Sequence, residues 1–141
     1  MPAPFVLFGD PLLVATTYLR DVLGAAATEV AHEPPGPEEY AAALPLVLIT
    51  QLPSPPMLNR YALDVARLDV EVHHDGELAD AMGLARLANA HMRALGGRTV
   101  ELVTVSTVRN TTTPEPREDP NDSVRVAGFT CELVLRPIPQ S

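Results

Sequence analysis

Acidic and histidine side chains gather in the short stretch "LDVEVHHDG", where Asp69, Glu71 and His73 alternate with apolar residues. In an extended strand, side chains two positions apart lie on the same face, so these three share one face. Two carboxylates beside an imidazole could act as a general acid and a general base. The same alternation is typical of the solvated face of a half-buried strand, and this second interpretation is the one that we favour from the sequence.

The histidine pair His73-His74 and the adjoining Asp75 resemble a metal site only in composition. Neighbouring side chains on a strand point to opposite faces, so the two imidazoles cannot easily share one metal ion. Asp75 stands just before Gly76 and a helical pattern, where its carboxylate could cap the helix. We therefore predict a strand-to-helix corner here, and no metal ligand.

Other residue types with chemical potential lack a suitable context. Cys131 is the single cysteine, which excludes an internal disulfide and a zinc site built on several cysteines. It falls in the apolar row of a strand pattern, which predicts a buried and inert thiol. Ser106 has no nucleophile-elbow pattern, and Gly96-Gly97 is too little for a phosphate loop. We expect no cofactor and no catalytic activity.

Regular elements follow from periodicity and from turn residues. In "DPLLVATTYLRDVLG", Asp10 and Pro11 are typical of a helix start, apolar residues recur at helical spacing, and Gly24 suits its end. Alternating or continuous apolar runs predict strands, and proline-rich stretches predict loops. The predicted elements are helices at 11–23 and 76–95, strands at about 45–52, 62–74, 99–108 and 124–136, and long loops at 33–44 and 109–123.

This element order predicts an α+β fold in a single domain spanning residues 1–141. We expect a mostly antiparallel sheet of four to five strands, with two helices packed on one face. The fifth strand would be a short one around Thr28–His32, ahead of the first long loop.

The predicted loop at 109–123 is rich in charge and contains three prolines. A connection of roughly 15 residues without regular structure is uncommon in a compact domain, and is often functional or disordered. A floppy tip and an arm that orders on meeting a partner share this composition, and the sequence leaves both interpretations open. Its charged residues are Arg109, Glu115, Arg117, Glu118, Asp119 and Asp122.

The amino-acid composition limits the kinds of partner that the chain could bind. The formal net charge is −8, and all ten basic residues are arginine. Sequence-independent binding to nucleic acid depends on basic side chains that neutralise phosphates. An acidic chain is therefore a poor candidate for binding DNA. No apolar run approaches the roughly 20 residues that span a bilayer. The start "MPAPFVLFGD" lacks the pattern of a signal peptide, so we expect a soluble protein made in the cytoplasm.

The stretches "DPLLVATTYLRDVLG", "LPLVLI", "LDVARLDVEV" followed by a helix, and the closing "TCELVLRP" together resemble a known family. In order and spacing they are similar to the tail terminator (tail completion) proteins of long-tailed bacteriophages, especially those that infect GC-rich actinobacteria. The resemblance covers nearly the whole chain and is one of spacing and length, not of a single motif.

The resemblance implies a non-catalytic virion protein at the head–tail junction, assembled in the host cytoplasm. Six copies would form a ring that caps the tail tube protein, ends its polymerisation and presents a surface to the head-side connector protein, while DNA passes without specific binding. Candidate subunit-interface residues are Arg67, Asp69, Glu71, His73, Arg86 and Arg93. The charged residues of the loop at 109–123 would contact the tube or the neighbouring subunit.

Two alternatives remain at this stage. The chain could be another phage neck component, such as a head-closure or head–tail joining protein, since these share size and assembly role. It could also be a small cytosolic ligand-binding or enzymatic α+β domain that uses Asp69, Glu71 and His73. The second alternative predicts a pocket beside that strand and a histidine with a perturbed pKa.

Overall fold

A computed structural model describes residues 6–54 and 63–139 of the chain. The first helix, α1 (Pro11–Leu23), has the predicted bounds. The Asp10 carboxylate accepts a hydrogen bond from the Leu12 backbone N–H at 2.9 Å, and Pro11 occupies the first helical position. Gly24 ends the helix with a φ of 52°, a backbone conformation that glycine adopts at little cost.

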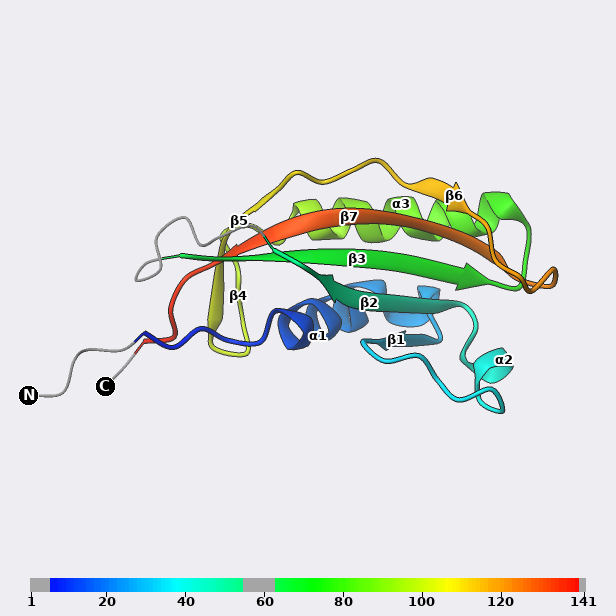
Figure 1. Cartoon of the computed structure of the whole chain (residues 1–141), viewed down its shortest axis with the longest axis horizontal. Helices are drawn as coiled ribbons and strands as arrows, with labels where there is room; N and C mark the ends of the chain where they lie inside the picture. Colours follow the sequence, from blue (N-terminus) through cyan, green and yellow to red (C-terminus); the bar gives the residue numbers. More distant parts are fainter. Residues whose placement is uncertain (1–5, 55–62, 140–141) are drawn as a thin grey trace, which may run out of the picture.

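The sheet contains seven strands and is mixed, where we expected four or five mostly antiparallel strands. Its order is β1-β2-β3-β7-β5-β4, and β6 also pairs with β7 (Figure 1). The sheet is mixed because β1 runs parallel to β2, whereas every other pair is antiparallel. The α+β class is confirmed. The strands are β1 (Glu29–Ala31), β2 (Leu46–Leu52), β3 (Asp64–His74), β4 (Thr99–Val100), β5 (Val103–Arg109), β6 (Glu115–Arg117) and β7 (Arg125–Leu135).

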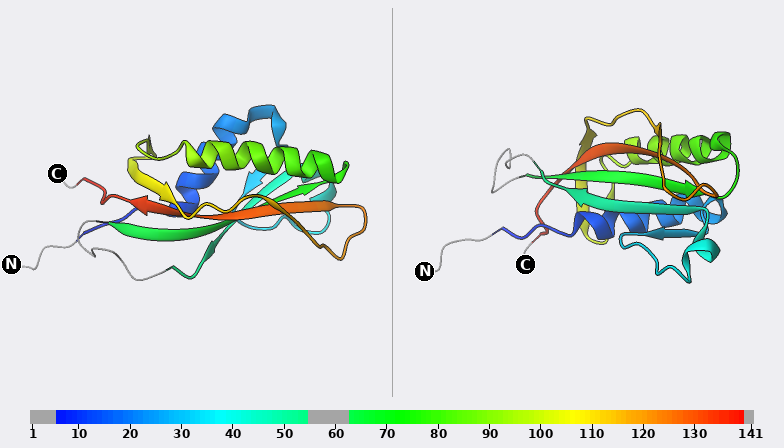
Figure 2. Two further views of the ribbon diagram at one scale, coloured as in Figure 1. Left: turned by 90° about the horizontal axis from the view of Figure 1, so that it is seen from above. Right: turned by 45° about the vertical axis from the view of Figure 1, so that its right-hand side comes forward.

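Helices α1 and α3 (Leu78–Arg93) cover the same face of the sheet, as expected (Figure 2). Beneath them lies one apolar cluster, because alternate residues of β3 and β7 point toward the helices. At its centre Leu68, Phe129 and Met92 are almost fully buried. None of the helices in the described ranges is both long enough and apolar enough to cross a membrane.

Two predicted elements differ in detail. The loop at 33–44 includes a four-residue helix, α2 (Tyr40–Ala43). The strand expected at 99–108 is wrong as a single element, because β4 and β5 form a hairpin around Glu101 and Leu102. Both residues have positive φ, 52° and 67°, as a type I′ turn requires. Glu-Leu lacks the Asn-Gly chemistry that normally marks such a turn, so no local pattern predicted it.

The other bounds shift by a few residues. Strand β2 begins at Leu46 and β7 ends at Leu135, close to the predicted limits. Strand β3 begins at Asp64, and residue 62, where its start was expected, lies outside the described residues. Helix α3 is shorter than the predicted 76–95, because its capping residue is Glu77 and not Asp75.

Candidate functional site

The predicted alternation along β3 is confirmed. Leu68, Val70 and Val72 are buried under the helices. Asp69, Glu71 and His73 lie on the opposite face of β3, which together with the matching face of β7 we call the polar face. From the sequence we favoured a solvated face, but the polar face is only partly solvated. The side chains of Asp69 and Glu71 are 19% and 28% exposed, and each is bound by partners within the chain.

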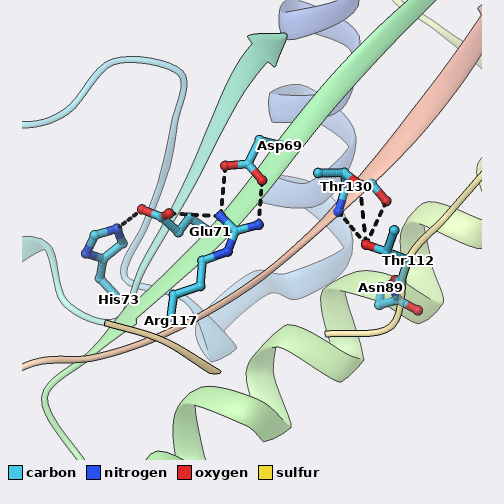
Figure 3. A network of polar contacts seen from close by, with 7 residues as sticks. All are labelled: Asp69, Glu71, His73, Asn89, Thr112, Arg117 and Thr130. Atoms are coloured by element: carbon cyan, nitrogen blue, oxygen red, sulfur yellow. Dashed lines mark hydrogen bonds and ion pairs between the residues drawn. The ribbon is translucent and has the colours of Figure 1, made fainter. Parts of the chain in front are cut away.

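Arg117 of β6 binds both carboxylates (Figure 3). Its Nη1 and Nη2 donate to the two oxygens of Asp69 at 2.9 and 2.7 Å, and Nη1 also donates to Oε2 of Glu71 at 2.9 Å. This fork is the geometry in which a guanidinium group recognises carboxylates most strongly. The expected intersubunit residues Asp69 and Glu71 are therefore brought together with Arg117, a residue of the loop at 109–123.

Gly128 provides the path by which Arg117 crosses β7. It stands opposite Glu71 in the β3–β7 register and opposite Glu115 in the β6–β7 register. A Cβ atom at this position would lie 2.5 Å from Cζ and 2.7 Å from Nε of Arg117, closer than such atoms approach. The guanidinium group thus occupies the space that a side chain would take. A glycine inside an apolar strand often marks such a close approach, and this was the available sequence signal.

His73 extends the network to the loop that carries α2. Its Nε2 lies 2.8 Å from Oε1 of Glu71, and its Nδ1 lies 2.6 Å from the hydroxyl of Tyr40. Since an ionised carboxylate can only accept, we assign the proton to Nε2, and the Tyr40 hydroxyl then donates to Nδ1. The His73 side chain is 10% exposed. Tyr40 follows a proline-rich loop, and nothing in the sequence indicated its role.

The network shifts the pKa of three of its members, and hydrogen bonds to Asp69 and Glu71 raise that of Arg117. The hydrogen bond from His73 and, against the opposing effect of burial, the Arg117 guanidinium lower the pKa of Glu71 to about 2. Burial, with the nearby charges of Asp119 and Glu71, raises the pKa of Tyr40 above its ordinary value. Efficient general bases have a pKa near the working pH. At neutral pH Glu71 is therefore a weak base and Tyr40 a weak nucleophile.

Glu132 forms the centre of a second charged cluster on the polar face. Its side chain accepts hydrogen bonds from Asn110 Nδ2 at 2.7 Å and Arg109 Nε at 3.0 Å, and Arg67 Nε lies 3.7 Å away. The hydrogen bond from Asn110 and the guanidinium of Arg109 lower the pKa of Glu132 despite its burial. Glu132 was missed from the sequence because it follows Cys131 in an otherwise apolar run.

The loop expected at 109–123 follows β7 in its first half and includes strand β6, so it is not a structureless connection. We call residues 110–124 the arm. Its Thr112 exchanges backbone and side-chain hydrogen bonds with Thr130 of β7 (Figure 3). Strand β6 then pairs with residues 126–128 of β7. Between the pairs Arg109–Glu132 and Glu115–Gly128, six steps along the arm match four along β7, so the ladder contains bulges.

Helix α3 holds the outer side of the arm. Asn89 donates to the Thr112 carbonyl at 2.9 Å, and Arg93 donates to the Thr111 carbonyl at 3.3 Å and to Asn89 Oδ1 at 2.9 Å. Arg93, expected at a subunit interface, thus has partners within its own chain. Arg86 is exposed on α3, and among the described residues its side chain forms no hydrogen bond or ion pair.

The acidic part of the arm lies at the surface. Glu115, Glu118 and Asp122 are exposed, and Asp119 is half-buried. Glu118, Asp119 and Asp122 border an open hollow of about 540 Å³, which Arg117 and Leu78 also line. The structure leaves these carboxylates available to a partner.

The corner after β3 has the predicted role with a different capping residue. His74 Nδ1 accepts the Gly76 backbone N–H at 2.8 Å, which closes the turn. Glu77 caps α3, and the Asp80 carboxylate accepts a hydrogen bond from the Glu77 backbone N–H at 2.9 Å. The cap predicted at Asp75 is wrong because the helix begins two residues later.

Comparisons with known proteins add no assignment: no protein-family model matches the chain, and no curated protein sequence is significantly similar to it. Within residues 6–54 and 63–139, no three side chains of the types His, Cys, Asp and Glu are placed to hold a metal ion together.

Proposed function

We propose that this chain is a structural protein of a phage virion: a tail terminator that forms a ring on the finished tail tube and offers the joining surface for the head. The observation that supports the proposal is the set of contacts that the charged residues on β3 form. Asp69 and Glu71, which could have done acid–base chemistry, hold the arm onto the sheet through Arg117. Their role in this protomer is architectural.

The alternative of an enzyme is weakened by the same geometry. Glu71 has both oxygens engaged, one by His73 and one by Arg117, and its pKa is lowered to about 2. A substrate would have to displace an ion pair and the arm to reach it.

Charge distribution supports a ring through which DNA passes. Seven of the nine arginines that the structure describes use their side chains in hydrogen bonds or ion pairs within the chain. The net charge of −8 and the exposed carboxylates of Glu115, Glu118 and Asp122 would repel phosphates. A channel lined by such a surface lets DNA slide without holding it.

A closed ring needs two different, complementary patches on each copy. The exposed acidic residues of the arm are candidates for one patch, and Arg86 on α3, which has no partner among the described residues, is a candidate for the other. The tail tube protein and the head-side connector would be the other partners. Six copies follow from the resemblance alone.

The proposal is tested with purified chain and the tube protein from the same source. Tubes are assembled with and without the chain, and their lengths and ends are examined by negative-stain electron microscopy. We expect rings at one end of the tubes and an arrest of elongation after the chain is added. Unchanged growth with bare tube ends would contradict the proposal and would favour a neck component that acts on the head side.

A further inference from the structure

Asp69, Glu71 and Gly128 together form a slot shaped for a guanidinium group, which we call the arginine slot. The two carboxylates stand two positions apart on one face of β3, and Gly128 leaves room beside them on β7. The Arg117 guanidinium meets both carboxylates from this space beside Gly128. In the protomer the slot is filled by Arg117 of the same chain.

The arm that carries Arg117 is held almost entirely by polar contacts. Of residues 110–124 only Pro114 and Val124 are buried. Strand β6 has three residues with Pro116 at its centre, and bulges interrupt the ladder between Thr112 and β6. Segments with few buried apolar contacts open at a lower free-energy cost than global unfolding. The arm is therefore the part of this face that can leave the sheet while the core stays folded.

We propose that the arginine slot is a site through which copies of this chain join: the arm of one copy leaves its own sheet and places its Arg117 in the slot of the next copy. An open arm on an isolated protomer would leave Asp69 and Glu71 without a cation, which is unfavourable. In a closed ring each copy gives one arm and receives one, so every slot is filled. A neighbour's arm has the same sequence and can form each contact that is seen within the chain.

This inference rests on the proposed ring, because it describes how neighbouring subunits meet. It differs from the sequence-based expectation in assigning one defined ligand to one defined site. It also predicts that the ion pairs on β3 persist in the assembly, with their arginine supplied by a second chain.

Disulfide trapping tests the exchange. The Thr112 and Thr130 hydroxyl oxygens lie 3.4 Å apart, so cysteines at these positions can be joined when the arm is docked. One chain carries Thr112→Cys and a second carries Thr130→Cys, both with Cys131→Ala and with tags of different mass. The two are unfolded, mixed, refolded at high concentration and oxidised, and the products are separated on non-reducing gels.

We expect a mixed two-chain product, and roughly tenfold less of it when the Thr112→Cys chain also carries Arg117→Gln. A single chain with both cysteines must form the internal link, which shows that the geometry permits the bond. Circular dichroism of each variant confirms that it is folded. Formation of the internal link without any mixed product overturns the proposal, as does a mixed product that is unaffected by Arg117→Gln.

Failure of the exchange and failure of the terminator function are distinguishable. A chain that caps tubes but never gives the mixed product loses only the arm exchange. A chain that gives the mixed product but does not act on tubes keeps the arginine slot and loses the proposed function.

Discussion

Replacing Gly128 by alanine should detach Arg117 from the arginine slot. The added Cβ would lie 2.5 Å from Cζ of Arg117, on a backbone fixed between β3 and the arm. The guanidinium group must then move, and we expect it to lose its hydrogen bonds to Asp69 and Glu71. The rest of the fold is untouched, because the new methyl group points away from the helix-covered core.

The magnitude follows from the exposure of the groups. Hydrogen bonds to charged groups contribute about 1.5–3 kcal/mol when buried, and exposed ion pairs about 0–1 kcal/mol. The side chains of Arg117, Asp69 and Glu71 are 30%, 19% and 28% exposed, which places each pair between these limits. At about 1 kcal/mol for each of two pairs, the loss is about 2 kcal/mol. Alanine recovers about 0.5–1 kcal/mol through lower chain entropy in the unfolded state.

We therefore expect Gly128→Ala to lower the free energy of unfolding by about 1–1.5 kcal/mol, and the Tm by about 3–6 °C. Urea denaturation and thermal melts followed by circular dichroism measure both. Gly83→Ala is the matched control: nothing lies within 4 Å of a Cβ there, and the position is helical, so that variant should be more stable. The reasoning is refuted if Gly128→Ala is equally damaging in an Arg117→Ala background, because the collision partner is then absent.

Three further outcomes follow from the structure. Because the pKa of Glu71 is depressed in the folded state, its contribution to stability is complete above its ordinary pKa of 4.5 and is lost as the pH falls toward about 2. Glu71→Gln should remove this pH dependence. Urea denaturation midpoints of both proteins between pH 7 and pH 2 measure the difference. Leu102→Gly should raise the unfolding free energy by about 0.5–1 kcal/mol in thermal melts, since Leu102 has a φ of 67° and is 77% exposed; an equal or lower Tm would contradict this. Burial raises the pKa of the Cys131 thiol to about 12, so a chromogenic thiol reagent should label Cys131 only after denaturation, and rapid labelling of the native protein would show that the thiol is accessible.

Local sequence signals were sufficient to predict several helices and strands. Helix α1 was predicted to the residue because Asp10, Pro11 and Gly24 mark its ends and its apolar stripe is regular. The alternation of β3 likewise predicted which side chains lie under the helices. These features depend on neighbours in the sequence, which is where propensity and periodicity act.

Other features depend on contacts between distant residues and could not be predicted. Arg117 meets Asp69 across 48 positions, and the proline-rich composition of its segment indicated a loop. Tyr40 reaches His73 from such a loop as well. The parallel pairing of β1 rests on three residues, too few to define a direction. Among these features, only Gly128 was visible in the sequence, as a glycine inside an apolar strand. Its role as the space for Arg117 could be recognised only from the register of β7 against β3 and β6.

The central claim is tested most directly by electron microscopy of lysates from the parent phage with a stop codon placed early in this gene. Expression of the intact chain from a plasmid is the control that restores the wild-type result. The account predicts overlong tails of variable length, separate from DNA-filled heads. Tails of normal length beside filled heads would contradict termination and indicate a joining role, and intact infectious particles would exclude the chain from assembly altogether.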